Sequence, residues 1–160
     1  ILDTEPAKLK QLLSLQKVDV LLANGRTPLY AACELGRPEL VRLLLRSNAN
    51  VEKGLVVRAN NAVVSSSSPL YAACIEKKKA CFECAMILID AGANVNQSVI
   101  TTQVATNGTT PLLAAVGHAD EALAARLLEA AADPNHVGQN MVAPLYSARQ
   151  QQARTHLTPR

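Results

Sequence analysis

Aromatic residues are scarce in this sequence, which has three Tyr, one Phe and no Trp among 160 residues. Small and aliphatic side chains must therefore fill any core, since 49% of the chain is hydrophobic. Proteins that bind single-stranded nucleic acid use aromatic rings to stack on the bases. The composition argues against that class of protein.

Long apolar runs and a large charge of one sign are also missing. No segment approaches the run of about 20 apolar residues that a membrane-spanning helix needs, and residues 1–5 do not resemble a signal peptide. The formal net charge is only +3, and acidic and basic residues alternate, as in Glu39, Arg42 and Arg46. Nucleic-acid-binding proteins usually have a stronger and more segregated basic surface. We therefore expect no membrane partner and do not favour nucleic acid as a partner.

What the sequence does contain is one phrase that recurs along the chain. It reads Thr-Pro-Leu-Tyr-Ala-Ala at 27–32, Ser-Pro-Leu-Tyr-Ala-Ala at 68–73, Thr-Pro-Leu-Leu-Ala-Ala at 110–115 and Ala-Pro-Leu-Tyr-Ser-Ala at 143–148. In the first three copies a hydroxyl precedes the proline, so it can cap a helix that begins with that proline. The fourth copy has Ala143 instead, which should cost about 1 kcal/mol of capping.

Each of the first three copies continues into a second apolar helix and a closing segment. These are Glu39–Leu45 with Asn48–Val51, Ala85–Ile89 with Ala91–Asn96, and Leu123–Leu128 with Ala132–Asn135. The alanines of the phrase keep one helix face thin, which lets helices of adjacent units approach closely. A repeat array buries its core between neighbouring units and has no default catalytic cleft, so the pattern favours a binding surface.

The pattern resembles the ankyrin repeat, in which Thr-Pro-Leu-His opens the unit and Gly-Ala-Asp-Val-Asn closes it. The resemblance covers nearly the whole chain and implies an all-α solenoid of stacked helix-turn-helix units with β-hairpin fingers. We expect one array over 1–160. Its parts are a partial repeat at 1–22, repeats at 23–52, 68–96 and 108–136, fingers at 53–67 and 97–107, and a partial repeat at 137–160. Tyr30, Tyr71 and Tyr146 stand where the family has His, and we expect their hydroxyls to replace its polar contacts.

Two of the fingers are predicted to be lengthened. The prolines of successive phrases are 41, 42 and 33 residues apart, and 33 is the ordinary ankyrin period. Leu55–Val57 and Ala62–Val64 are β-prone arms around the turn-prone Arg58–Asn61, which predicts a hairpin. Val99–Thr101 and 104–106 are similar arms with poor turn residues between them. We expect the two hairpins to pair into a sheet of about four strands, although surface loops can also vary in length without a function.

The cysteines do not point to a metal site. Cys81 and Cys84 have the spacing of a zinc or redox pair, but no second pair of ligands accompanies them. Core packing explains Cys33, Cys74 and Cys84, which fall at small or apolar helix positions. Free thiols imply a reducing compartment, so we expect a cytoplasmic or nuclear protein without metal or cofactor.

Catalysis is not expected either. The three histidines are scattered at His118, His136 and His156, and no Ser or Cys near His118 has a reason to be activated. The polar residues that follow His118 fit a turn between two helices. We therefore predict that the chain is not an enzyme and has no small-molecule substrate.

The resemblance implies a scaffold for protein–protein interaction that binds another protein or a peptide. In the ankyrin family the finger tips and the concave face of the inner helices make the contacts. The residues at these places are Arg26, Lys53, Arg58, Asn60, Asn61, Gln97, Thr102 and Gln103 on fingers, and Glu34, Glu76, His118 and Gln151 towards the ends of inner helices.

Two other functions stay open. The chain could be the substrate-recruiting or regulatory domain of a larger enzyme or ubiquitin-ligase-type protein, because the array begins and ends within partial repeats and so predicts a piece of a longer protein or a half-formed last repeat. It could also bind phosphorylated or nucleic-acid ligands electrostatically through Arg26, Arg37, Lys53, Arg58 and the run Lys77–Lys79.

Overall fold

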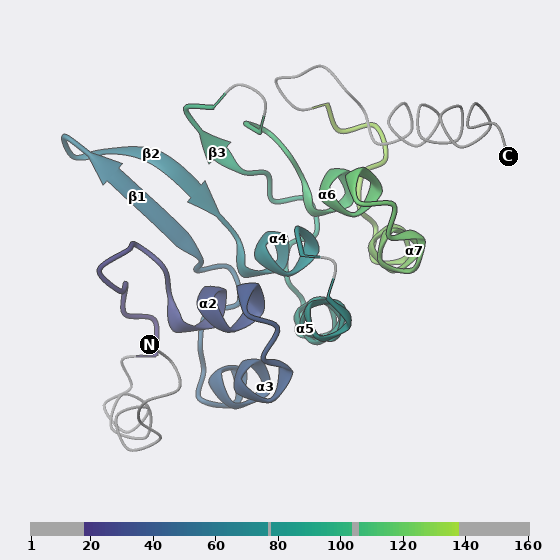
Figure 1. Cartoon of the computed structure of the whole chain (residues 1–160), viewed down its shortest axis with the longest axis horizontal. Coiled ribbons are helices and arrows are strands. Elements are labelled where there is room, and N and C mark those ends of the chain that lie inside the picture. The colour runs from purple at the N-terminus through teal and green to yellow at the C-terminus, as the bar shows by residue number, and fades with distance from the viewer. Residues whose placement is uncertain (1–17, 77, 104–105, 138–160) are drawn as a thin grey trace, which may run out of the picture.

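Two layers of helices and a small sheet make up the fold. The computed structural model describes residues 18–76, 78–103 and 106–137 (Figure 1). The inner helices are α2 (Pro28–Glu34), α4 (Pro69–Cys74) and α6 (Pro111–Gly117), and the outer helices are α3 (Pro38–Arg46), α5 (Lys79–Asp90) and α7 (Glu121–Glu129). Each inner helix packs on the outer helix that follows it and on the next inner helix. The three pairs stack side by side, as the helix-turn-helix pattern predicted.

The inner helices begin as the sequence predicted. A hydroxyl oxygen accepts a hydrogen bond from the backbone N–H three residues later, and a proline follows the capping residue. The pairs are Thr27 with Tyr30 at 3.2 Å, Ser68 with Tyr71 at 3.2 Å and Thr110 with Leu113 at 3.3 Å. All three caps are buried. Ala143 of the fourth phrase lies outside the described residues.

The core runs between the two layers along the length of the stack. Ala32, Ala73 and Ala115 of the inner helices have no exposed surface, which fits the close approach that the small residues predicted. Larger aliphatic side chains fill the space between the layers. Those buried most completely are Leu29, Val41, Leu44, Leu70, Leu88, Leu112, Leu123 and Leu127. Burial of these residues holds adjacent units together, because no unit encloses a core of its own.

The closing segments of neighbouring units are joined by hydrogen bonds that the sequence analysis did not predict. A polar side chain at the end of one segment accepts a hydrogen bond from a backbone N–H of the next. The pairs are Asp19 with Asn50 at 3.0 Å, Glu52 with Asn94 at 2.7 Å and Asn96 with Asp133 at 2.7 Å. This ladder satisfies backbone donors and fixes the spacing of the units along one side of the stack.

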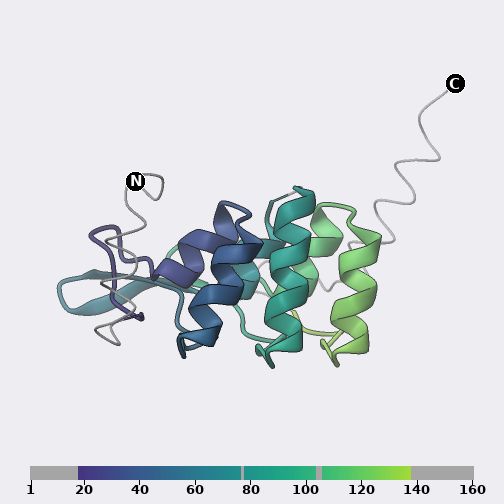
Figure 2. The ribbon, with the colours of Figure 1, turned by 90° about the horizontal axis from the view of Figure 1, so that it is seen from below.

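The first finger forms an antiparallel hairpin where the sequence predicted one. Its strands are β1 (Leu55–Ala59) and β2 (Ala62–Ser67), joined by Asn60 and Asn61. Both asparagines have positive φ angles, 50° and 64°, which a tight two-residue hairpin turn requires. The register shifts between Val57 and Arg58. Figure 2 shows the hairpin projecting past the end of the helix stack.

The second finger departs from the prediction, because its described residues form no second hairpin. Only β3 (Ile100–Thr101) is a strand, and it pairs with β2, so the sheet of the described residues has three strands in the order β1-β2-β3 rather than about four. Thr106 of the predicted second arm lies in a turn, and residues 104–105 lie outside the described part. The Asn107 side chain accepts a hydrogen bond from the Thr101 N–H at 3.1 Å, which occupies the edge that a returning strand would need.

Candidate binding surface

The projecting part of the sheet gathers five of the twelve residues proposed to contact a partner. Arg58, Asn60 and Asn61 lie together at the hairpin tip, where all three are exposed, and the Arg58 guanidinium donates to the Asn61 carbonyl at 3.4 Å. Thr102 and Gln103 are also exposed and lie beside β2, because the Thr102 N–H donates to the Val64 carbonyl at 3.2 Å. Pairing of β2 with β3 thus brings two segments about 40 residues apart onto one surface.

A second group follows the ends of the inner helices. Glu34 ends α2, Glu76 follows α4 and His118 caps the end of α6, and all three are half-buried. These helices stack in order (Figure 1), so the three residues lie near the same end of successive inner helices. Glu34 and Glu76 already have cationic partners, Arg26 at 2.9 Å and Lys78 at 3.2 Å.

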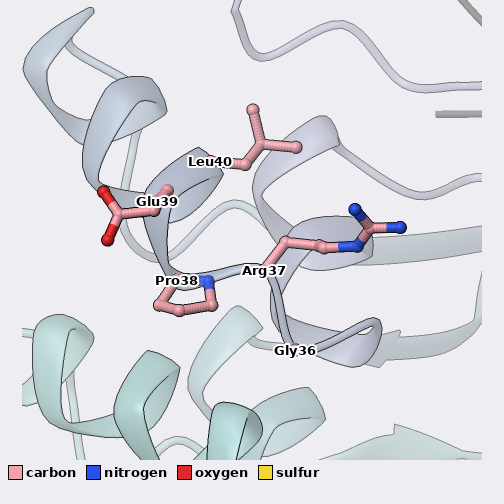
Figure 3. Close-up of a pocket in the computed structure, with 5 residues that line it drawn as sticks. All are labelled: Gly36, Arg37, Pro38, Glu39 and Leu40. Carbon is pink, nitrogen blue, oxygen red and sulfur yellow. The ribbon is translucent and has the colours of Figure 1, made fainter. Parts of the chain in front are cut away.

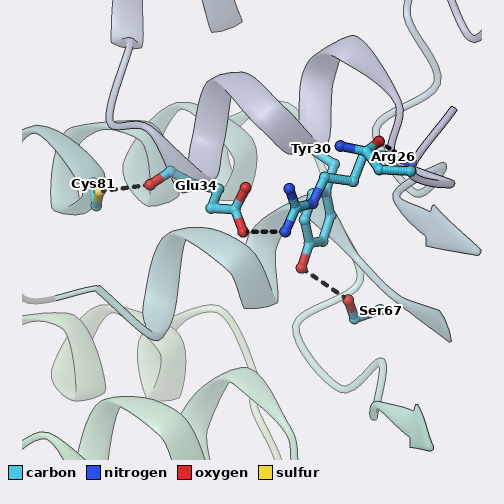
Figure 4. A network of polar contacts seen from close by, with 6 residues as sticks. Arg26, Tyr30, Glu34, Ser67 and Cys81 are labelled. Atoms are coloured by element: carbon cyan, nitrogen blue, oxygen red, sulfur yellow. Dashed lines mark hydrogen bonds and ion pairs between the residues drawn. The ribbon is translucent and has the colours of Figure 1, made fainter. Parts of the chain in front are cut away.

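A polar network ties the root of the first finger to the inner helix α2 (Figure 4). The Arg26 guanidinium lies 6.0 Å from the centroid of the Tyr30 ring and pairs with Glu34. The Tyr30 hydroxyl accepts a hydrogen bond from Ser67 Oγ, 3.3 Å away, at the end of β2. Burial raises the pKa of Tyr30, so the hydroxyl stays protonated. Tyr30 therefore makes a polar link to the next unit, as expected for the residue in place of His, whereas the described residues offer the Tyr71 hydroxyl no hydrogen-bond partner.

The remaining proposed residues lie apart from the tip. Lys53 precedes β1 at the root of the first finger and is exposed, and its carbonyl accepts a hydrogen bond from Thr27 Oγ1 at 2.7 Å. Gln97 precedes β3 and is half-buried, and its side-chain oxygen has no hydrogen-bond partner among the residues that the structure describes. Gln151 lies outside the described residues. The predicted set thus divides into a tip, a row of helix ends and two finger roots.

All four cysteines are free and buried, with at most 2% of their surface exposed. Cys81 belongs to the core as well, and its sulfur lies 3.9 Å from the Glu34 carbonyl oxygen (Figure 4). Burial raises the pKa of every thiol, that of Cys84 to about 12, so little thiolate is present at neutral pH. The part of the chain that the structure describes has no cluster of three His, Cys, Asp or Glu arranged to hold a metal ion, and no helix there is long and apolar enough to cross a membrane.

One hollow of about 300 Å³ lies at the turn between α2 and α3, lined by residues 36–40. Figure 3 shows the Arg37 and Glu39 side chains pointing in different directions, with Leu40 on another side of the turn. Small-molecule sites combine an apolar cavity with a few polar groups that converge on the ligand. The lining side chains of this hollow do not converge, so it offers no such arrangement.

The stacked helix pairs agree with a comparison against protein families. A family model described as ankyrin repeats (3 copies) matches residues 4–99, more than half of the chain. The chain belongs to the ankyrin repeat family. No curated protein matches it. The match ends before α6 and α7, but these helices repeat the cap and the packing of the first two pairs. Ankyrin repeats are generally protein–protein interaction modules and typically non-catalytic, so the surface of the stack is the place to look for function.

The sequence analysis missed a set of exposed aliphatic residues beside the first finger. Val20, Leu21 and Leu22 lie just before the turn that leads into α2, and Val57 lies on β1; between 36% and 43% of each is exposed. A signal was available, because the segment before the Ala23-Asn24-Gly25 turn is a connection between repeats, which is usually polar, and it carries three consecutive aliphatic residues.

Proposed function

We propose that this ankyrin array is a non-enzymatic module that binds a partner protein or peptide through its front surface. The front surface comprises the tip and second-finger residues Arg58, Asn60, Asn61, Thr102 and Gln103, with the row of helix ends, Glu34, Glu76 and His118. The observation that carries the proposal is the projecting hairpin. Its tip contributes nothing to the helical core, yet it is built on a specific turn and held at its root.

The hairpin is held in place from both sides. The Val56 N–H donates to the Gly25 carbonyl at 2.8 Å, on the side of the turn before α2. On the other side β2 pairs with β3, and Ser67 is bonded to Tyr30. An isolated hairpin is marginally stable in water, but one anchored in this way is pre-organised and loses less entropy when a partner binds.

We further propose that both fingers are longer than the usual ankyrin finger and that the first was extended for contact. The spacings of 41 and 42 residues against 33 support this proposal. A reducing compartment, cytoplasmic or nuclear, would suit four buried free thiols.

The test is a front-surface variant that leaves the fold intact. Alanine at Asn60 or Asn61 would strain the turn, since both residues have positive φ. The variant therefore combines Arg58→Ala with Asn60→Gly and Asn61→Gly. A protein captured by the unmodified chain should bind this variant at least about tenfold more weakly, a difference of about 1.4 kcal/mol.

The matched control is Arg46→Ala, which removes an exposed arginine from the outer helix α3, on the far side of the stack from the sheet (Figure 1). This control should bind the captured protein normally, and the melting temperatures of both variants should stay within a few degrees of that of the unmodified chain. Equal affinity of the front-surface variant and the control would remove the hairpin tip from the binding surface.

A further inference from the structure

A shallow groove lies beside the first finger, on the side of β1 that faces away from β2. Its volume is about 370 Å³, and we name it the finger groove, lined by residues 21–25 and 56–58. It exists because β1 is longer than the turn that pairs with it. Arg26 bridges to Leu55 and Gly25 bonds to Val56, and within the described residues no later residue of β1 bonds to the turn.

The floor of the groove is fixed by a close approach of two backbones. Gly25 has a φ of 76°, and a Cβ atom on it would lie 2.4 Å from the Val56 carbonyl oxygen, so only glycine fits. The turn is also closed internally, because Leu22 N–H donates to the Arg26 carbonyl and Gly25 N–H to the Leu22 carbonyl, both at 2.8 Å. The groove is therefore a defined feature of the fold.

The walls of the groove are aliphatic and open to water. Leu21 is 43% exposed, Leu22 36% and Val57 37%, and the neighbouring Val20 is 40% exposed. Exposed aliphatic residues gathered around a hollow, with polar residues such as Asn24 at the rim, are typical of an interaction site. None of these side chains is needed by the buried core between the helix layers.

Arg58 supplies a cation at the end of the groove. Within the described residues its guanidinium makes one hydrogen bond, to the Asn61 carbonyl at 3.4 Å, and no ion pair, whereas Arg26, Arg42 and Arg126 are all paired with carboxylates. A guanidinium in this state is free to bind a carboxylate through two parallel hydrogen bonds. Charge complementarity therefore selects an acidic ligand.

The backbone of Arg58 also faces the groove side of β1. Successive peptide groups of a strand point to opposite edges, and the Val56 N–H already points away from β2, toward Gly25. The N–H and C=O of Arg58, two residues later, therefore lie on the same open edge. An open edge of this kind accepts an extended peptide as an additional strand.

We propose that the finger groove binds an extended segment of a partner protein that carries an aliphatic residue and, two residues away, a carboxylate. Alternate residues of an extended strand share one face, as Val56 and Arg58 do on β1. The aliphatic side chain can therefore enter the hollow beside Val56 while the carboxylate two positions along meets Arg58. The peptide backbone pairs with the open edge at Arg58. This inference rests on the proposed function and adds the chemistry of the partner.

The test measures binding of a defined peptide to the full chain by fluorescence anisotropy. The probe is a fluorescein-labelled nine-residue peptide of Thr and Val with a central Leu and an Asp two residues later. It should bind saturably, and a peptide with Asn in place of Asp should bind about tenfold more weakly, because it loses the charge-assisted hydrogen bonds to the Arg58 guanidinium. A peptide with Thr in place of Leu should be weaker by a similar factor.

Matched variants distinguish specific binding in the groove from non-specific hydrophobic binding. Leu21→Ser should weaken binding about tenfold, whereas Leu43→Ser, at a position 41% exposed on α3, should not change it. Likewise Arg58→Gln should weaken binding and Arg46→Gln should not. The Arg58→Gln chain should no longer distinguish the Asp peptide from the Asn peptide, because their only difference is the contact already removed.

Absence of saturable binding, equal affinity for the Asp and Asn peptides, or equal effects of Leu21→Ser and Leu43→Ser would each overturn the inference. The Leu21→Ser result does not bear on the front surface, because Leu21 lies outside it, whereas Arg58 belongs to both surfaces. If a captured partner loses affinity for the front-surface variant but binds the Leu21→Ser chain normally, the proposed function stands and the groove inference fails.

Discussion

The two fingers of this array have similar strand-forming residues and different structures. Residues 55–67 form a complete hairpin, whereas in the second finger two residues, Ile100 and Thr101, form the short strand β3 against it. Both segments are rich in β-branched residues. The composition of the arms therefore does not explain the difference.

The residues at the turn explain it. Asn60 and Asn61 adopt left-handed backbone conformations at low cost, which a two-residue hairpin turn requires at both positions. The second finger has Thr102 and Gln103 at the corresponding place, and a β-branched residue is strained there. The chain instead makes a wider turn, with the Thr106 and Asn107 N–H groups bonded to the Gln103 carbonyl. Turn chemistry thus decides whether β-prone arms become a hairpin.

The largest expected effect comes from the root of the first finger. A Cβ atom on Gly54 would lie 2.1 Å from the Ser67 carbonyl oxygen and 3.1 Å from Pro69, so Gly54→Ala should lower the free energy of unfolding by about 3 kcal/mol. Ser98 occupies the matching place in the second finger, and Ser98→Ala should change stability by less than about 0.5 kcal/mol. Urea denaturation of both variants tests this, and equal midpoints would show that the two roots are packed alike.

A smaller effect is expected from the link between the first finger and α2. Tyr30→Phe leaves the buried Ser67 hydroxyl without its partner and should cost about 1 kcal/mol. Tyr71→Phe removes a hydroxyl that has no partner among the described residues and should be close to neutral. Thermal and urea unfolding of the pair measure the difference, and a Tyr71→Phe variant as unstable as Tyr30→Phe would contradict it.

The smallest expected effect is at the turn itself. Asn61→Gly keeps the positive φ of 64° without a side chain and should raise stability by about 0.5 kcal/mol. Gln103→Gly should give no gain, because Gln103 does not have a positive φ, and glycine adds entropy only to the unfolded chain. A gain in stability at both positions, measured by urea denaturation, would mean that both turns favour a residue with positive φ, and would contradict the difference between the two fingers.

Much of the fold could be predicted from local patterns. The helix starts at Pro28, Pro69 and Pro111 follow from a capping hydroxyl next to a proline, because cap and helix lie within four residues of each other. The first hairpin also follows from its arms and its Asn60–Asn61 turn. The predicted second hairpin does not form within the described residues, where the Thr101 N–H bonds to the Asn107 side chain instead of to a returning strand.

The candidate site was less predictable than the fold. Arg58, Asn60 and Asn61 could be placed at a tip because they are turn residues of a predicted hairpin. Arg26 precedes α2 and Glu34 ends it, so their ion pair spans the length of the helix. Ion pairs on a helix are predicted between residues three or four apart, and these two are eight apart. The finger groove could not be predicted, because it depends on how far β1 extends past the turn at 21–25.

By itself the sequence determined the family, the stacked helix pairs and the place of the first finger. These depend on short-range features: caps and small residues on one helix face, which recur in each unit, and the turn at Asn60 and Asn61. The tertiary structure alone decided which strands pair, which charges neutralise one another and which aliphatic side chains stay in water. Those outcomes depend on contacts between segments distant in the chain, and such contacts form only when the units stack.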